Sequence, residues 1–153
     1  MSTIDERLAE LGITIPVVVP PVAAYIPAVV SGNLVFTSGQ LPMVEGVLPA
    51  TGKLGAAVSD QEGKELARQC ALNALAAVAS VIGSFDRVTR IEKVVGFVAS
   101  DPDFTGQPGV INGASEILGQ IFGDAGVHAR SAVGVTVLPL NSPVEVELVV
   151  EFA

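Results

Sequence analysis

Two apolar runs near the end of the chain constrain the fold more than any other feature. In residues 130–138 and 144–152, β-branched and other apolar residues recur at alternating positions, and a short segment around Asn141 separates the two runs. This pattern is typical of β-strands joined by a turn. We therefore expect the two runs to pair as an antiparallel hairpin about Asn141.

Arg130 begins the first of these strands, and Glu145 stands near the start of the second. The forked donors of a guanidinium can grip a carboxylate, and a glutamate can hold or activate a water molecule. The pair therefore suggests chemistry on a small acid. In the expected hairpin Glu145 faces Val137, which is roughly 23 Å from Arg130 at the usual strand rise. One chain could hardly bring both side chains into one pocket, but neighbouring subunits could.

Both residues also have a purely structural interpretation. Arg130 could be a solvated residue at a strand end, and Glu145 and Glu147 could form the wet face of a half-buried strand. Ala132 lies two residues after Arg130 and therefore on the same face of its strand. A side chain this small leaves room for a ligand beside the guanidinium, which favours the carboxylate clamp.

The composition limits the classes of partner. Half of the 153 residues are hydrophobic and 16% are charged, which is more apolar than the surface of a soluble monomer requires, so we expect an oligomer interface. The length fits one domain, 1–153, with an N-terminal arm over 1–24. The net charge of −8, with only eight lysines and arginines, argues against nucleic acid as a partner.

Few residues are available for metal or disulfide chemistry. Cys70 is the only cysteine and His128 the only histidine, so no ligand spacing for a metal and no internal disulfide is indicated. Patterns for dinucleotide or ATP binding are also absent, and we expect no cofactor. The first residues lack the features of a signal peptide, and no apolar run has the length of a membrane span. We expect a cytoplasmic protein without membrane association.

The remaining patterns predict an α+β domain. A short helix begins after Ser2 or Thr3 and ends at Gly12, and a proline-rich extended segment follows. The elements expected next are a hairpin turning at 31–33 with a strand ending at Gly39, a loop at 43–60 that could act as a flap, a helix at 60–81, a strand at 90–100 and a helix at 108–122. The order β, β, helix, β, helix, β, β favours two helices on one face of a mixed sheet.

Several other residues are candidates for a binding site. Tyr25 could wall a pocket or pack in an interface, and Ser38 and Gly39 lie where a strand ends in the sequence TSGQ, which could also be an ordinary turn. Asn112 on the second long helix could donate to a ligand or face solvent. Cys70 falls on the buried stripe of its helix and is predicted to be a core residue.

His128 lacks a recognisable nucleophile partner in the sequence, so we do not expect it to act directly.

Four segments together resemble the YjgF/YER057c/UK114 family, also called the Rid (reactive intermediate deaminase) family and formerly the L-PSP endoribonuclease family. They are AAYIPAVVSGNLVFTSGQLP at 23–42, ARQCALNALAAVASVIGSFDRVTRI at 67–91, VINGASEILGQIFG at 110–123 and ARSAVGVTVLPLNSPVEVELVVEF at 129–152. The resemblance runs from about Tyr25 to the end of the chain.

The resemblance implies a chorismate-mutase-like (bacillus type) fold that assembles as a homotrimer with clefts between subunits. It further implies that Arg130 clamps the carboxylate of a 2-imino or 2-enamino acid such as 2-aminoacrylate. Glu145 would then position the water that hydrolyses the imine to a 2-keto acid and ammonia. The substrate-binding residues implied by the resemblance are Tyr25, Ser38, Gly39, Asn112, Arg130 and Ala132.

The chain departs from the family pattern in two respects. Ala132 stands where the deaminases often have a cysteine, and the N-terminal arm and the 43–60 loop are longer than in compact members. Two other classes of function therefore stay open. One is a non-catalytic trimer that binds a small carboxylate or a protein partner, and the other is a ribonuclease, which would require a positive surface that this acidic chain lacks.

Overall fold

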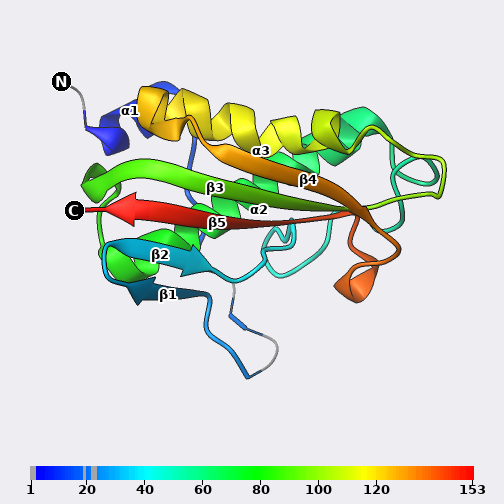
Figure 1. The fold of residues 1–153 in the computed structure, drawn as a ribbon, viewed down its shortest axis with the longest axis horizontal. Helices are drawn as coiled ribbons and strands as arrows, with labels where there is room; N and C mark the ends of the chain where they lie inside the picture. The colour runs from blue at the N-terminus through cyan, green and yellow to red at the C-terminus, as the bar shows by residue number, and fades with distance from the viewer. Residues whose placement is uncertain (1–2, 19, 22–23) are drawn as a thin grey trace.

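A five-stranded mixed sheet and two long helices form the described part of the protein (Figure 1). The computed structural model describes residues 3–18, 20–21 and 24–153. The strands are β1 (Ala28–Ser31), β2 (Leu34–Thr37), β3 (Val88–Ala99), β4 (Ala129–Val135) and β5 (Val144–Phe152). The helices are α1 (Ile4–Glu10), α2 (Asp60–Ile82) and α3 (Gln107–Phe122), with short 3-10 turns η1 (Phe85–Arg87), η2 (Gly123–Gly126) and η3 (Pro139–Asn141).

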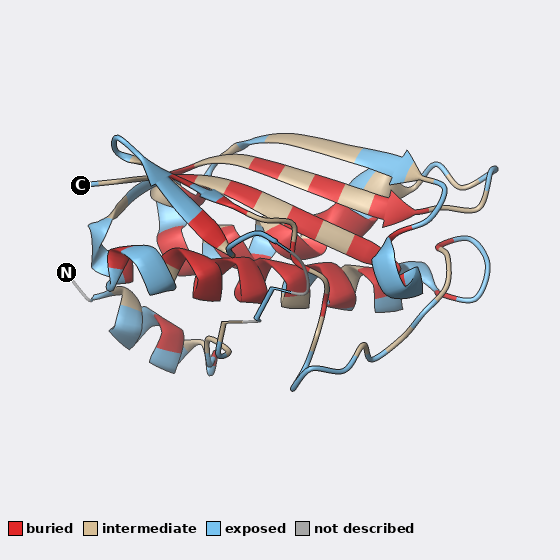
Figure 2. Cartoon of the chain, turned by 90° about the horizontal axis from the view of Figure 1, so that it is seen from below, coloured by how far each residue is buried: buried red, intermediate tan, exposed pale blue. Residues whose placement is uncertain are grey.

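The predicted α+β class and the two predicted long helices are confirmed. Ser59 caps α2 by accepting the backbone N–H of Glu62 at 3.2 Å, and Pro108 occupies the first turn of α3, where its missing N–H has no cost. Both helices pack on one face of the sheet, as Figure 2 shows from the side. The opposite face carries no long helix among the described residues.

The predicted hairpin between the last two strands is wrong. The strand order is β1-β2-β5-β3-β4, so β3 lies between β4 and β5. β4 pairs in parallel with β3, and β5 pairs antiparallel with β3 on its other edge. Glu145 consequently pairs with Phe97 and not with Val137. The reason is that α3 connects β3 to β4 as a βαβ unit, which places β4 parallel to β3 and leaves the second edge of β3 for β5.

Alternation along β5 separates a buried face from an open face. Val144, Val146 and Leu148 are at most 1% exposed and face the helices, whereas Glu145 and Glu147 alternate with them on the open face. The core therefore lies between the sheet and the two helices, where buried residues gather in Figure 2.

Cys70 belongs to this core, as predicted. It is fully buried on α2, and its Sγ lies 3.9 Å from the carbonyl oxygen of Val144. Burial, and secondarily the charge of Glu145, raises the pKa of the Cys70 thiol well above its ordinary value, so the group stays protonated and unreactive.

Among the described residues, α2 is the one helix with the length and composition of a membrane span. However, 67% of its apolar 18-residue window is buried inside the fold.

Part of the 43–60 segment, which could act as a flap according to the sequence, is packed down in the structure. Leu54 is fully buried, and its backbone exchanges hydrogen bonds of 2.9 Å with the end of β3 through Ala99 and Asp101. This part of the segment is therefore fixed at the end of β3. At the other end of the chain, Thr3 caps α1 as predicted. Ser2, the alternative cap, lies outside the described residues.

Candidate functional site: a carboxylate pocket and a supported arginine

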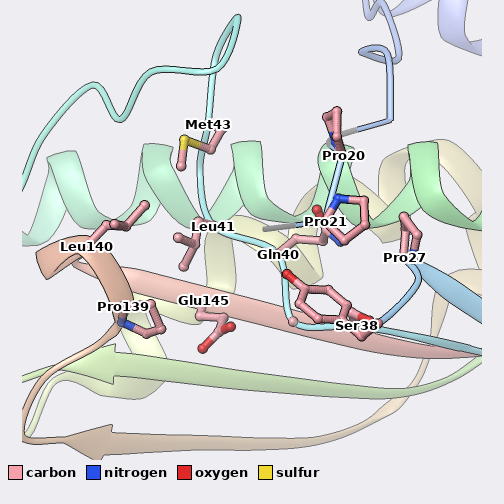
Figure 3. A pocket seen from close by; sticks show the side chains of 12 residues that line it. Pro20, Pro21, Pro27, Ser38, Gln40, Leu41, Met43, Pro139, Leu140 and Glu145 are labelled. Atoms are coloured by element: carbon pink, nitrogen blue, oxygen red, sulfur yellow. The ribbon is translucent and has the colours of Figure 1, made fainter. Parts of the chain in front are cut away.

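Glu145 lies in a pocket of about 570 Å³ on the open side of the sheet (Figure 3). The N-terminal arm, the segment after β2 and the η3 turn supply its lining. The lining residues are Pro20, Pro21, Tyr25, Pro27, Ser38, Gly39, Gln40, Leu41, Met43, Pro139, Leu140 and Glu145. Three of the residues proposed from the sequence, Tyr25, Ser38 and Gly39, therefore share one pocket with Glu145.

The segment 38–40 is fixed between the arm and β5. Ser38 donates its hydroxyl to the carbonyl oxygen of Ile26 at 2.6 Å and its N–H to the carbonyl oxygen of Pro27 at 2.8 Å. Gln40 exchanges backbone hydrogen bonds of 2.8 and 3.0 Å with Val146. These bonds hold Gly39 directly against Glu145.

Gly39 is required by the close approach of the Glu145 carboxylate. A Cβ built on Gly39 would overlap the Oε1 atom of Glu145. Any side chain at position 39 would therefore push the carboxylate away from its place. The glycine of the TSGQ sequence is thus explained by contact with an acid, although its direct contact with a ligand remains a prediction.

The environment of Glu145 favours the protonated form of its carboxyl group. Burial, and then repulsion from the nearby Glu147, raises the pKa of Glu145 above its ordinary value. A carboxylate whose pKa is shifted toward neutrality is a better proton acceptor than an ordinary one, and it can return the proton later in a reaction. The pocket can therefore support general acid–base chemistry.

The wall of the pocket beyond Gly39 is held by a buried amide. Asn73 of α2 has no exposed surface, and its Nδ2 donates to the carbonyl oxygens of Leu41 and Met43 at 2.9 and 3.0 Å. Gln69 donates to its Oδ1 at 3.1 Å, so each of its polar atoms has a partner. A network that is fully satisfied in the interior is rigid, and the wall is preformed.

Arg130 lies on the other side of the sheet, against α3. Its Nη1 donates to Oδ1 of Asn112 at 2.8 Å and to Oγ of Ser115 at 3.2 Å. Asn112 and Ser115 are three positions apart and therefore share one face of α3. No described residue accepts a hydrogen bond from Nε or Nη2, so this edge of the guanidinium is available for a bidentate carboxylate.

His128 and Ser115 form a chain of hydrogen bonds that ends at Arg130. Nδ1 of His128 is 2.6 Å from the carbonyl oxygen of Gly126, which can only accept, so this nitrogen carries the proton. In the neutral ring Nε2 then accepts the hydroxyl of Ser115 at 2.8 Å. The serine oxygen is left with a lone pair toward Nη1 of Arg130. The sequence indicates no nucleophile partner for His128, and the structure gives it a hydrogen-bond partner, Ser115.

Arg130 and Glu145 of one chain do not share a pocket. Arg130 pairs with Val94 and faces the helices, whereas Glu145 pairs with Phe97 and faces the open side. At usual strand dimensions their Cα atoms are about 14 Å apart, which is closer than the roughly 23 Å expected from the hairpin. The two side chains nevertheless point to opposite faces. Ala132 lies on the same face as Arg130 and is partly buried against the core, as its spacing predicted.

Ser115 and the apolar residues that line the pocket beside Glu145 were not predicted from the sequence. Ser115 carries no motif, and its only signal was its spacing of three residues from Asn112 on a predicted helix. Leu41, Met43 and Leu140 lie on segments without periodic pattern, and only the fold brings them together. No group of three or more His, Cys, Asp or Glu side chains suited to a metal ion occurs within the part of the chain that the structure describes.

Comparison with known proteins places the chain in a family. Residues 5–152 match the model of the family described as "YjgF/chorismate_mutase-like, putative endoribonuclease", and the chain belongs to this family. The fold predicted from the resemblance is thereby confirmed.

Similar proteins cover nearly the whole chain. Protein TCP17 of Trypanosoma cruzi is 43% identical over 95% of this chain and 91% of its own length. Atu1372 of Agrobacterium tumefaciens, a protein of unknown function, is 44% identical, with a TM-score of 0.91 over 98% of this chain and 92% of that one. A candidate endoribonuclease of Shewanella oneidensis MR-1 is 34% identical, with a TM-score of 0.95 over 99% and 100% of the two chains.

Proposed function

We propose that the protein is a hydrolytic deaminase that converts reactive 2-imino and 2-enamino acids to 2-keto acids and ammonia. The observation that carries the proposal is the position of Glu145, which lies half-buried in a preformed pocket with Tyr25, Ser38 and Gly39. Arg130 adds a guanidinium with one edge available for a carboxylate. We place the activity in the cytoplasm. The family resemblance favours this location, and the single buried cysteine is consistent with a reducing compartment.

The cleft would form between copies of the chain in a homotrimer. Arg130 and Glu145 face opposite sides of the sheet, so a second copy must supply one of them. The open face of the sheet carries Val29, Phe36 and Val133, which are 41–47% exposed. An apolar surface of this kind is typical of a protein–protein interface. Closed cyclic symmetry would give each cleft an arginine from one copy and a glutamate from its neighbour.

The proposed reaction requires only binding, orientation and proton transfer. Arg130 holds the substrate carboxylate, and Glu145 accepts a proton from water as the water oxygen bonds to C2 of the imine. Glu145 returns this proton to the nitrogen, which gives the neutral carbinolamine. The hydroxyl proton then passes to nitrogen through Glu145, the C–N bond breaks with its electron pair on nitrogen, and ammonia leaves as the C2–O bond becomes a carbonyl. Imino acid and water thus give keto acid and ammonia, with effective molarity and general base catalysis supplying the acceleration.

The test is the release of ammonia and keto acid from freshly generated 2-aminoacrylate and 2-iminobutanoate. We expect acceleration by the wild-type protein and its loss in Arg130→Ala and in Glu145→Gln. Matched controls are Arg90→Ala, which removes an exposed arginine of β3, and Glu151→Gln, which changes a glutamate further along β5. Both controls should retain activity.

A folded trimeric wild type that accelerates neither reaction would contradict the deaminase proposal. In that case, carboxylate binding that is lost in Arg130→Ala would point to the non-catalytic binding protein. Cleavage of RNA at a rate that depends on Glu145 would instead point to a ribonuclease. The net charge of −8 argues against strong RNA binding at physiological salt.

A further inference from the structure

One side of the Glu145 pocket is entirely apolar. In Figure 3, Leu41, Met43, Pro139 and Leu140 gather on one side of the Glu145 carboxylate, and Ser38, Pro21 and Pro27 lie on the other. We refer to Leu41, Met43, Pro139 and Leu140 as the apolar wall. A surface that only holds a small, fully polar acid has no need of such a wall.

Leu140 is held in an unfavourable backbone conformation at the rim of this wall. Its φ is +58°, in the left-handed region where a leucine is strained, and the residue is 62% exposed. The next residue, Asn141, has φ +59°, but asparagine tolerates this region. Strained residues of this kind tend to occur at functional sites. An exposed leucine kept at such a position suggests a contact that the isolated chain does not make.

The apolar wall is fixed before any ligand arrives. Asn73 holds the backbone of Leu41 and Met43 through two buried hydrogen bonds. At the η3 end of the same wall, the backbone carbonyl oxygen of Asn141 accepts the N–H of Gly52 at 2.9 Å. Preformed walls of this kind select ligands by shape, because little entropy is lost on binding.

We propose that the acid bound beside Glu145 carries a large apolar side chain, of the size found in leucine, methionine or phenylalanine. This inference rests on the proposed function and narrows its substrate class. With its carboxylate on the partner's arginine and C2 beside Glu145, the substrate directs its side chain onto the apolar wall. The part of the cleft that one chain supplies has a volume of about 570 Å³, which lies in the range that holds drug-sized ligands.

The test compares imines that differ only in the side chain. An L-amino acid oxidase generates the imines of leucine, methionine, phenylalanine and alanine in place, and the loss of each imine is followed with and without the protein. We expect kcat/KM for the leucine-derived imine to exceed that for the alanine-derived imine by at least about tenfold, since each methylene in an apolar pocket contributes roughly 10-fold or more.

Leu140→Asn is the sharpest variant because asparagine keeps the left-handed conformation while the apolar contact is lost. It should lower kcat/KM for the leucine-derived imine by about tenfold, a clearly larger factor than for the alanine-derived imine. Val17→Asn, which alters an arm residue that is 89% exposed and does not line the pocket, is the matched control.

The outcomes separate this inference from the proposed function. Preference for the alanine-derived imine, or an equal loss on both imines in Leu140→Asn, would overturn the inference while leaving deamination intact. If the protein accelerates the hydrolysis of no imine, the deaminase proposal itself fails. Calorimetry with 4-methyl-2-oxopentanoate and pyruvate then tests whether the apolar wall binds a branched side chain. Tighter binding of the branched acid, lost in Leu140→Asn, supports an apolar side-chain site, and equal or weaker binding rejects it.

Discussion

The surroundings of Arg130 and of Glu145 differ in kind. Arg130 stands on edge strand β4, and its Nη1 is fixed by two side chains of α3, one of which is held in turn by His128. Glu145 stands on central strand β5, and no described residue donates a hydrogen bond to its carboxylate. Its properties come from burial, from the repulsion of Glu147 and from the absence of a side chain at Gly39.

Under the proposed function, this difference separates recognition of the substrate from reactivity. A guanidinium that must grip a carboxylate benefits from fixed geometry, because less side-chain entropy is lost when the ligand binds. A carboxylate that must accept and return a proton benefits from a raised pKa and from oxygen atoms that remain available to water. Changes near Arg130 should therefore affect affinity, and changes near Glu145 should affect turnover. The following variants test this division, from the largest expected effect to the smallest.

Replacing Arg130 with lysine should have the largest effect. Lysine keeps the positive charge but loses the planar fork and the hydrogen bonds of Nη1 to Asn112 and Ser115. We expect kcat/KM to fall by about 100-fold, mostly through KM, because a bidentate charged hydrogen bond is lost. Steady-state kinetics measures this, with Arg90→Lys as the control. A variant that retains its affinity would show that charge alone holds the substrate.

Gly39→Ala should reduce turnover. The added Cβ displaces the Glu145 carboxylate, and because that group is the end of a flexible side chain the fold should tolerate the change. A misplacement near 1 Å can cost about 100-fold, so we expect kcat to fall by between about 10-fold and 100-fold with KM little changed. Gly119→Ala is the control, since open space surrounds that position of α3. An equal fall in the control would mean that the loss reflects general damage.

Ser115→Ala should weaken affinity by a smaller factor. The change removes one of the two acceptors of Arg130 Nη1 and disconnects His128 from the arginine. One hydrogen bond contributes about 1 kcal/mol, so KM should rise by about fivefold while kcat stays the same. Ser80→Ala, which removes a serine hydroxyl from α2, is the matched control. A change in kcat without a change in KM would contradict the assigned role of Ser115.

Glu145→Gln should alter stability in a pH-dependent direction. The pKa of Glu145 is raised by burial, so the folded state binds this proton more tightly than the unfolded chain, and the associated stability is lost as pH rises through the raised pKa. The neutral glutamine avoids the buried charge. We expect a higher Tm than wild type at pH 7 and a gap that closes below pH ~4, where both states are protonated. Thermal unfolding across this range, with the exposed Glu65→Gln as control, checks the sign.

Local patterns predicted the elements well. The spacing of apolar residues and the capping signals placed α2 and α3 within a residue or so of their observed bounds, because these helices bury one continuous stripe. The hairpin of β1 and β2 also agreed, because a short turn at Gly32, with φ +61°, joins adjacent strands.

Strand neighbours were less predictable. The pairing of β4 with β5 failed because the two strands flank β3, and no local signal reports that an earlier strand lies between two later ones. The residues of the candidate site also differed in how far the sequence could predict them. The roles proposed for Glu145 and Arg130 follow from the chemistry of their own side chains, whereas Ser115, Leu41 and Leu140 become relevant only through positions that the tertiary fold creates.

The most direct test of the shared cleft is complementation between two inactive variants. Arg130→Ala and Glu145→Gln are each purified, mixed under conditions that exchange subunits, and assayed for imine hydrolysis. If each cleft takes its arginine from one copy and its glutamate from the next, random mixing restores about a quarter of the clefts and a corresponding share of wild-type activity. A mixture that exchanges subunits yet stays inactive, beside an active wild type, would contradict a cleft shared between chains.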